Sequence, residues 1–156
     1  MQIFELASSG ITAADVGDIN RLLDQLTNAP KRFSYRDLKR FIKQKKIYVC
    51  VVMNGPRNKI IGMATLKIDD SLMFTQYFKK GYIGDVVVDE NNRGRGIAKA
   101  LMLYLINLAK DRRLAHISLT SNPNNPRRTA AIKMYESLGF KVIGQLGGSN
   151  YYRLYL

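Results

Sequence analysis

The stretch of the chain that decides the fold covers residues 86–99 and reads Val86-Val87-Val88-Asp89-Glu90-Asn91-Asn92-Arg93-Gly94-Arg95-Gly96-Ile97-Ala98-Lys99. A β-branched apolar run, typical of a strand, passes through polar turn residues and two glycines into a helical pattern. The first N–H groups of a helix have no partner within it, and its dipole is positive at that end. Glycine lets an anion approach the backbone. The stretch therefore predicts an anion site at a helix N-terminus, and the pyrophosphate of a cofactor is the expected anion.

Two common phosphate-binding motifs do not match this stretch. The dinucleotide fingerprint G-x-G-x-x-G/A would need Gly or Ala at position 99, where Lys99 stands, and it would follow the first strand of the chain. The P-loop pattern G-x-x-x-x-G-K-[ST] does not occur in the sequence. The remaining pattern is R-x-x-G-x-A, which consists of Arg93, Gly96 and Ala98.

The periodicity of the remaining sequence predicts alternating strands and helices. We expect strands at residues 2–6, 47–53, 59–68, 82–88, 115–120, 140–143 and 150–156, and helices at residues 13–26, 35–44, 97–112 and 126–138. Residues 69–81 are expected to form a long excursion that extends the hairpin of residues 47–68. The order β-α-α-β-β-β-α-β-α-β-β is typical of an α/β sandwich around a mixed sheet. The 156 residues contain no repeat or linker, so we expect one domain.

At this point the chain resembles the GNAT superfamily of N-acetyltransferases, whose signature Q/R-x-x-G-x-G/A is matched by Arg93, Gly96 and Ala98. A second landmark of that superfamily, A-x-x-x-Y-x-x-x-G-F, is similar to residues 131–140, with Tyr135 at the tyrosine position. The resemblance is good over residues 82–156, whereas the N-terminal half matches the superfamily only in the general order of its elements. It implies a single N-acetyltransferase domain over residues 1–156. The implied fold has a mixed, mostly antiparallel central sheet flanked by helices.

The resemblance implies acetyl-CoA as co-substrate. The backbone of Val86, Val87 and Val88 would pair with the pantetheine arm of that molecule. The residues implied to hold its pyrophosphate are Arg93, Gly94, Arg95, Gly96, Ile97, Ala98 and Lys99. Asn125 and Arg128 are two further candidate cofactor contacts, although many relatives have an asparagine where this chain has Arg128. Alternatively, residues 93–96 form a solvated turn that binds no ligand, and the three valines are ordinary core residues.

The resemblance also implies two catalytic residues for acetyl transfer to a primary amine by direct attack in a ternary complex. Tyr135 would donate a proton to the departing thiolate, since a phenol of pKa about 10 can protonate a thiolate whose acid has a pKa of about 8.5. Asp85 would lie beside the thioester, where relatives often carry a Glu-Asp pair. Gly84 stands in place of that glutamate. A carboxylate base, a water chain and desolvation of the amine therefore all stay open, as does a core role for Tyr135.

The charge of the chain suggests an anionic partner, because 25 Lys and Arg against 12 Asp and Glu leave a net charge of +13. Arg36, Lys39 and Arg40 share one face of the expected helix at residues 35–44, and we expect them to bind an anionic acceptor. A solvated helix face is the alternative. The acceptor would be a small-molecule or peptide amine. A nucleic acid is compatible with the charge, so a non-catalytic module that binds CoA or nucleic acid on the same fold remains the alternative function.

The expected location is the cytoplasm, since no stretch of the sequence is long enough to span a bilayer and the N-terminus lacks a signal-peptide pattern. A single cysteine, Cys50, excludes an internal disulfide and fits a reducing compartment. The sequence contains no His/Cys cluster that would predict a metal site. We expect a monomer or a homodimer.

Overall fold

The computed structural model describes residues 1–7, 9–28, 32–44, 47–55, 59–73 and 76–156. The strands are β1 (Gln2–Glu5), β2 (Ile47–Asn54), β3 (Lys59–Met73), β4 (Gln76–Val88), β5 (His116–Ser121), β6 (Lys141–Leu146) and β7 (Ser149–Tyr155). The helices are α1 (Ala13–Leu26), α2 (Tyr35–Lys43), α3 (Ile97–Asp111) and α4 (Thr129–Ser137), with short 3-10 turns η1 (Glu90–Asn92) and η2 (Pro126–Arg128). This order confirms the expected succession of strands and helices.

The strands form one sheet in the order β1-β2-β3-β4-β5-β7-β6. The pairs β1–β2, β2–β3, β5–β7 and β6–β7 are antiparallel, and β4–β5 is parallel, which confirms the mixed, mostly antiparallel sheet. The expected excursion at residues 69–81 proves to be the distal part of β3 and β4, and residues 74–75 within it lie outside the described residues. Residues 69–73 therefore lengthen β3 at its end, and residues 76–81 lengthen β4 at its beginning. β4 then continues into the strand expected at residues 82–88.

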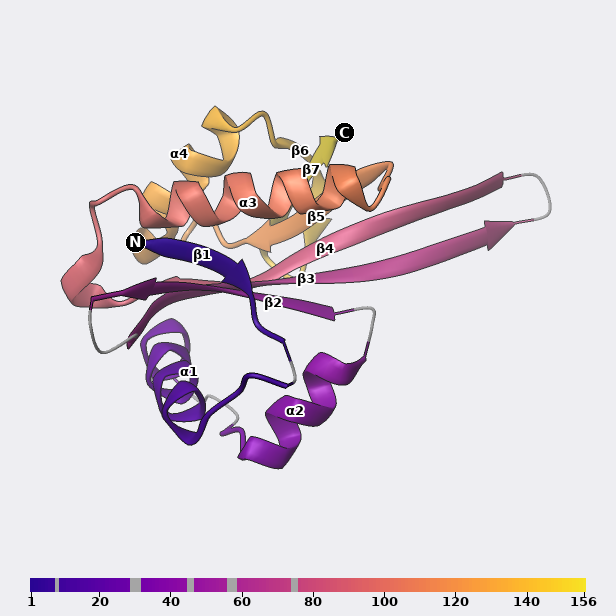
Figure 1. The fold of residues 1–156 in the computed structure, drawn as a ribbon. Helices are drawn as coiled ribbons and strands as arrows, with labels where there is room; N and C mark the ends of the chain where they lie inside the picture. Colours follow the sequence, from indigo (N-terminus) through magenta and orange to yellow (C-terminus); the bar gives the residue numbers. More distant parts are fainter. Residues whose placement is uncertain (8, 29–31, 45–46, 56–58, 74–75) are drawn as a thin grey trace. The chain divides into compact units, whose positions relative to one another are not determined.

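The chain divides into two compact units. The first contains Met1–Lys67 and Gly84–Leu105, and the second contains Ile68–Ile83 and Ile106–Leu156. In the first unit α1 and α2 cover one face of the strands and the beginning of α3 covers the other (Figure 1). In the second unit β7 pairs with both β5 and β6. The prediction of a single domain stays a prediction.

Capping residues determine where α1 and α2 begin. Thr12 accepts a hydrogen bond from the Asp15 N–H (3.2 Å), and the Asp15 carboxylate accepts from the Thr12 N–H (2.7 Å). Ser34 and Asp37 form the same reciprocal pair before α2. Each cap contributes about 1 kcal/mol and satisfies backbone donors that the helix leaves free. The core beneath these helices consists mainly of Ile19, Leu22, Leu23, Leu38, Val49, Val51, Ile60, Met63 and Val87.

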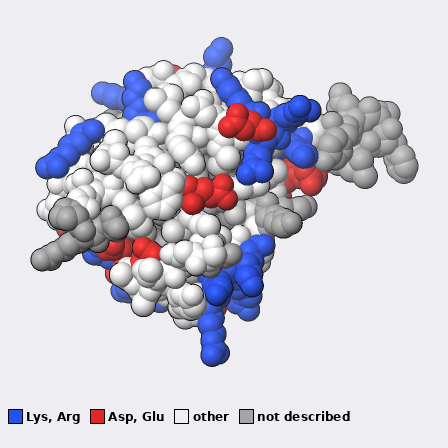
Figure 2. Space-filling model, in the orientation of Figure 1, with Lys and Arg blue, Asp and Glu red and all other residues white. Residues whose placement is uncertain are grey.

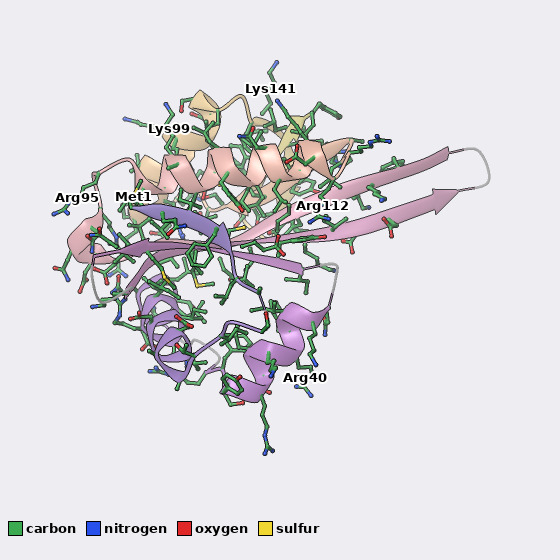
Figure 3. The ribbon with its side chains drawn as sticks, in the orientation of Figure 1. Met1, Arg40, Arg95, Lys99, Arg112 and Lys141 are labelled. Carbon is green, nitrogen blue, oxygen red and sulfur yellow. The ribbon has the colours of Figure 1, made fainter. Side chains whose placement is uncertain are left out.

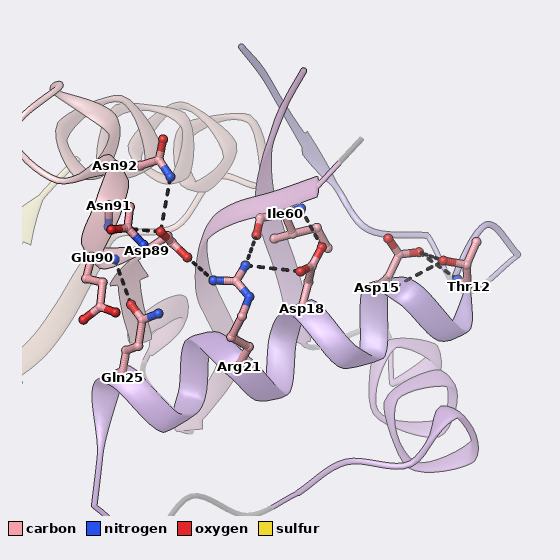
Figure 4. A network of polar contacts seen from close by, with 10 residues as sticks. All are labelled: Thr12, Asp15, Asp18, Arg21, Gln25, Ile60, Asp89, Glu90, Asn91 and Asn92. Carbon is pink, nitrogen blue, oxygen red and sulfur yellow. Dashed lines mark hydrogen bonds and ion pairs between the residues drawn. The ribbon is translucent and has the colours of Figure 1, made fainter. Parts of the chain in front are cut away.

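One arginine of α1 ties this helix to two strands (Figure 4). Arg21 forms an ion pair with Asp89, at the end of β4, and donates hydrogen bonds to the Ile60 carbonyl of β3 (2.8 Å) and to Asp18 (3.2 Å). Asp18 in turn accepts from the Ile60 N–H (2.9 Å). The network pairs both terminal nitrogens of a half-buried guanidinium, while its buried Nε has no hydrogen-bond partner, and it holds α1 against the end of β4, where the glycine-rich loop begins.

Asp89 is the acidic centre of this network, and its side chain is only 5% exposed. It also accepts hydrogen bonds from the Asn91 N–H (3.1 Å) and the Asn92 side chain (3.2 Å), which shape η1. Burial by itself would raise the pKa of Asp89, but these hydrogen bonds and the Arg21 charge outweigh burial and hold the pKa below its usual value. The folded state thus favours the carboxylate form.

The variant Arg21→Gln is expected to lower the free energy of unfolding by about 2 kcal/mol, because it leaves the buried Asp89 carboxylate without its cation. Urea unfolding at pH 7 measures the change. Because the folded pKa of Asp89 is lowered, its stabilising contribution is present above the unfolded pKa of about 3.9 and is lost as the pH falls through the folded pKa. The deficit of Arg21→Gln should therefore shrink in acid.

The matched control for this variant is Arg32→Gln. It removes an ion pair with Asp24 (2.8 Å) in which the Arg32 side chain is 65% exposed, and it is expected to cost less than about 1 kcal/mol. Equal losses in the two variants would contradict the special role of the Arg21 network.

Candidate functional site

The loop before α3 has the open backbone that an anion site needs. Gly94 and Gly96 have φ angles of +76° and +75°, and a Cβ built on either would meet no atom within 4 Å. Arg93, Arg95 and Lys99 are exposed around them. Arg95 and Lys99 extend away from the ribbon in Figure 3. The loop therefore leaves space next to its backbone and cations beside that space.

The beginning of α3 adds backbone donors to this loop. The first helical hydrogen bond runs from the Ala100 N–H to the Gly96 carbonyl (3.0 Å), so the N–H groups of Ile97, Ala98 and Lys99 have no partner within the helix. The Ile97 side chain is buried and anchors the loop in the core, which leaves its backbone as the part available to a ligand. Together with the positive end of the helix dipole, this arrangement fits a phosphate group.

Arg93 lies across the end of β4, because its Nε donates a hydrogen bond to the Val88 carbonyl (3.1 Å). One of the backbone groups expected to pair with a cofactor therefore has a partner within the protein. The terminal nitrogens of the guanidinium carry the remaining N–H donors of Arg93. The side chains of Val87 and Val88 are buried and that of Val86 is half-buried, so this segment can offer a ligand mainly its backbone.

Asp85 lies within β4 and has a φ of +50°, a left-handed conformation that a residue with a side chain rarely adopts. Its carboxylate accepts a hydrogen bond from the Thr65 hydroxyl of β3 (3.1 Å). The parallel ladder with β5 involves Lys80, Gly81 and Tyr82, and β4 continues through Asp85 to Val88 after it. The turn of the backbone at Asp85 therefore directs one carboxylate toward Thr65 just before the three valines.

Asp85 and Thr65 line a pocket of about 220 Å³ in the first unit. Most of its wall is apolar and comes from α1, α2 and the strands; the apolar residues include Leu23, Leu26, Phe33, Leu38, Phe41 and Met63. The pocket was not predicted from the sequence, because apolar residues on a helix face follow the same pattern whether they line a core or a pocket. The signal that could have found it is the pair of short amphipathic helices facing the strand that carries Asp85.

The basic residues of α2 lie elsewhere on that helix. Arg36 and Arg40 are exposed, Lys39 is half-buried with its ammonium 5.5 Å from the centre of the Tyr35 ring, and Arg40 pairs with Asp37 (3.3 Å). A group of Lys and Arg side chains covers α2 in Figure 2, and Arg40 points into solvent in Figure 3. The structure does not bring Arg36, Lys39 or Arg40 to the pocket wall, and their binding of an anionic acceptor stays a prediction.

The other candidates belong to the second unit. Tyr135 of α4 is buried, with its ring centre 6.2 Å from that of Phe140 and 6.4 Å from that of Tyr152. Burial raises the pKa of its hydroxyl, and the nearby positive charge of Arg128 opposes that effect only in part. Asn125 caps η2 by accepting a hydrogen bond from the Arg127 N–H (3.0 Å). The roles assigned to Tyr135, Asn125 and Arg128 stay predictions.

The described residues contain no group of three or more His, Cys, Asp or Glu side chains placed to hold a metal ion. None of the described helices has the length and hydropathy needed to cross a membrane.

Comparison with known proteins gives consistent matches. The sequence model of the "Acetyltransferase (GNAT) family" matches residues 18–140. A glucosamine 6-phosphate N-acetyltransferase of Trypanosoma brucei brucei is 29% identical over 146 residues, which cover 90% of this chain and 92% of that protein. A probable glucosamine 6-phosphate N-acetyltransferase of Drosophila melanogaster is 31% identical over 83% of this chain and 57% of its own length. The crystal structure of a Trypanosoma brucei acetyltransferase superimposes with a TM-score of 0.74 at 26% identity, covering 93% of this chain and 95% of that one.

The left-handed backbone at Asp85 can be tested by stability alone. Glycine adopts a positive φ without strain, so Asp85→Gly should be more stable than Asp85→Ala by about 1 kcal/mol in denaturant unfolding. The same pair of substitutions at exposed Lys67 of β3 serves as control, and there alanine should be the more stable, because glycine weakens an ordinary strand. The same order at both positions would contradict the strained conformation.

Proposed function

Since the chain belongs to the acetyltransferase (GNAT) family and is an N-acetyltransferase, we propose that it transfers the acetyl group of acetyl-CoA to a primary amine by direct attack in a ternary complex. The observation that carries the proposal is the open loop at Gly94 and Gly96. The loop leads into helix N–H groups that have no partner within the helix, and it is flanked by the exposed cations Arg95 and Lys99. We further propose that the whole chain works as one catalytic domain. The family match favours this enzyme over a non-catalytic module that binds CoA or nucleic acid.

The residues present fit the cofactor that the family implies. The N–H groups of residues 94–99 and the Arg95 and Lys99 side chains would hold the pyrophosphate, because a Cβ-free backbone and a helix N-terminus favour a doubly charged anion. The backbone of Val86 and Val87 would bind the pantetheine arm. Arg93 would hold the end of β4 through Val88 and offer its terminal nitrogens to a phosphate oxygen. Asn125 and Arg128 are proposed as further contacts. Bound acetyl-CoA supplies an acetyl group activated as a thioester.

Direct attack is supported over an acyl-enzyme route through the single cysteine. Cys50 is fully buried in β2, and burial raises the pKa of its thiol to about 12. A thiol of that pKa is protonated at neutral pH and is a poor nucleophile. Within this proposal the amine of the acceptor is therefore the nucleophile.

Two side chains would move or hold protons. Asp85, with Thr65 beside it, would bind the ammonium form of the acceptor and receive a proton from it directly or through water. Tyr135 would donate a proton to the departing thiolate. Since burial raises its pKa, its hydroxyl keeps its proton throughout the neutral range, as a proton donor must.

The central experiment measures binding and turnover separately. Acetyl-CoA is expected to raise the melting temperature of the protein, and thiol release should follow when a panel of primary amines is added. The variant Gly96→Ala should weaken acetyl-CoA binding about tenfold, or about 1.4 kcal/mol, because its Cβ enters the open space of the loop and the residue must keep a positive φ.

Gly148→Ala is the matched control for Gly96→Ala. Gly148 has a φ of +78° and an equally open surrounding, but it lies in the β6–β7 turn, far from the loop along the chain. It should lose the same stability and no affinity for acetyl-CoA. Equal affinity losses in both variants, or no stabilisation of the wild type by acetyl-CoA, would overturn the assigned loop.

The role of Tyr135 is tested by Tyr135→Phe. This variant keeps the ring packing against Phe140 and Tyr152, and it should lower kcat about a hundredfold while acetyl-CoA affinity stays unchanged. Because the pKa of Tyr135 is raised above its usual value of about 10, deprotonation of this residue should not reduce the wild-type kcat between pH 7 and pH 9. An unchanged kcat in steady-state assays of the variant would assign Tyr135 to the core alone.

A further inference from the structure

The pocket beside Asp85 carries information about the acceptor. Asp85 directly precedes Val86, so the carboxylate lies next in the chain to the segment proposed to bind the pantetheine arm. The pocket extends from Asp85 and Thr65 to apolar side chains of α1 and α2, among them Leu23, Leu38 and Phe41. A molecule that reached Asp85 through this pocket would be in contact with hydrocarbon over most of its length.

The charge of the pocket is opposite to that of the chain as a whole. Among the described residues that line it, Asp85 is charged and none is a lysine or an arginine. The basic residues Arg36 and Arg40 are on the exposed side of α2. Asp85 itself is exposed. A phosphate placed here would be repelled by its carboxylate and would lack a cation among those residues. An ammonium group, by contrast, would be paired.

The polar groups of a sugar also fit this pocket poorly. Each hydroxyl moved from water to an apolar wall needs a hydrogen-bond partner. Apart from Asp85, the described polar side chains that line the pocket are Thr27 and Thr65, and Thr65 already donates to Asp85. The wall is therefore complementary to a hydrocarbon group on one side and to one ammonium on the other.

We propose that the acceptor is a primary amine carried by an apolar alkyl or aryl group, with its ammonium on Asp85 and its apolar group in the pocket. The inference rests on the proposed acetyl transfer and names its substrate class. The acceptor class thus differs from glucosamine 6-phosphate, which appears in the names of two relatives. In the reaction the ammonium first gives one proton to Asp85 or to water, which passes it to solvent. The neutral amine nitrogen then bonds to the acetyl carbon and the thioester C–S bond breaks. The second proton lost by nitrogen balances the proton gained by the thiol.

The test compares acceptors at saturating acetyl-CoA, with thiol release as the readout. Phenethylamine should give a kcat/KM at least tenfold above that of glucosamine 6-phosphate. From propylamine to hexylamine, kcat/KM should rise about fourfold per methylene, as burial of each CH₂ predicts. A dipeptide amide with N-terminal phenylalanine tests whether the pocket also accepts an apolar primary amine that belongs to a peptide. Turnover at the level of phenethylamine would support recognition of the same ammonium and apolar group.

The outcomes separate this inference from the function on which it rests. If glucosamine 6-phosphate is the better acceptor, or if acetyl-CoA stabilises the protein and none of the apolar amines is acetylated, the acceptor class is wrong and the cofactor assignment stands. If acetyl-CoA neither stabilises the protein nor releases thiol with any amine, the proposed function itself fails.

A variant at the pocket wall gives an independent readout. Thr27 caps the end of α1, is exposed, and lines the pocket. Thr27→Trp should raise the KM for phenethylamine about tenfold, and the smaller Thr27→Leu should raise it less, while the KM for acetyl-CoA stays unchanged. The matched control is Leu103→Trp, which places the same indole on the exposed side of α3. An unchanged phenethylamine KM in both Thr27 variants would overturn the proposal.

Discussion

The ion pair between Arg21 and Asp89 is the contact on which the geometry of the first unit depends. It connects α1 to the end of β4, and through the Ile60 carbonyl it connects both to β3. The same helix supplies Ile19 and Leu23 to the pocket wall. One guanidinium therefore positions two features at once, namely the start of the glycine-rich loop and the wall that faces Asp85. A half-buried charge can do this because the terminal nitrogens of a guanidinium carry several N–H donors in a fixed plane, and here they reach acceptors on three different segments.

The first unit separates two kinds of recognition along a short piece of chain. After Asp85 the backbone provides N–H groups and the loop adds cations, an arrangement suited to an anion. At Asp85 the left-handed residue presents a carboxylate to an apolar pocket, an arrangement suited to a cation with an apolar body. The net charge of +13 thus describes the surface and the loop, and it says nothing about the pocket.

Local features were the part of the structure that could be predicted. The periodic helices and the glycine loop at residues 93–99 depend on neighbours in sequence, and the structure confirms the helices expected at residues 13–26, 35–44 and 97–112. Two features could not be predicted in this way. The Arg93 hydrogen bond to Val88 depends on how the loop folds back, and the distal parts of β3 and β4 mix polar and apolar residues, so their periodicity is weak.

By itself the sequence determined the order of the elements, the family and the glycine loop before α3, because glycine turns and hydrophobic periodicity are local properties of the chain. Only the tertiary structure decided which side of α2 faces a pocket. Both of its faces are consistent with the sequence pattern, one basic and one apolar, and packing against α1 and the strands turns Leu38 and Phe41 inward. The tertiary structure likewise joined Asp85 to Thr65, twenty residues away, because strand pairing and not sequence proximity brings these side chains together.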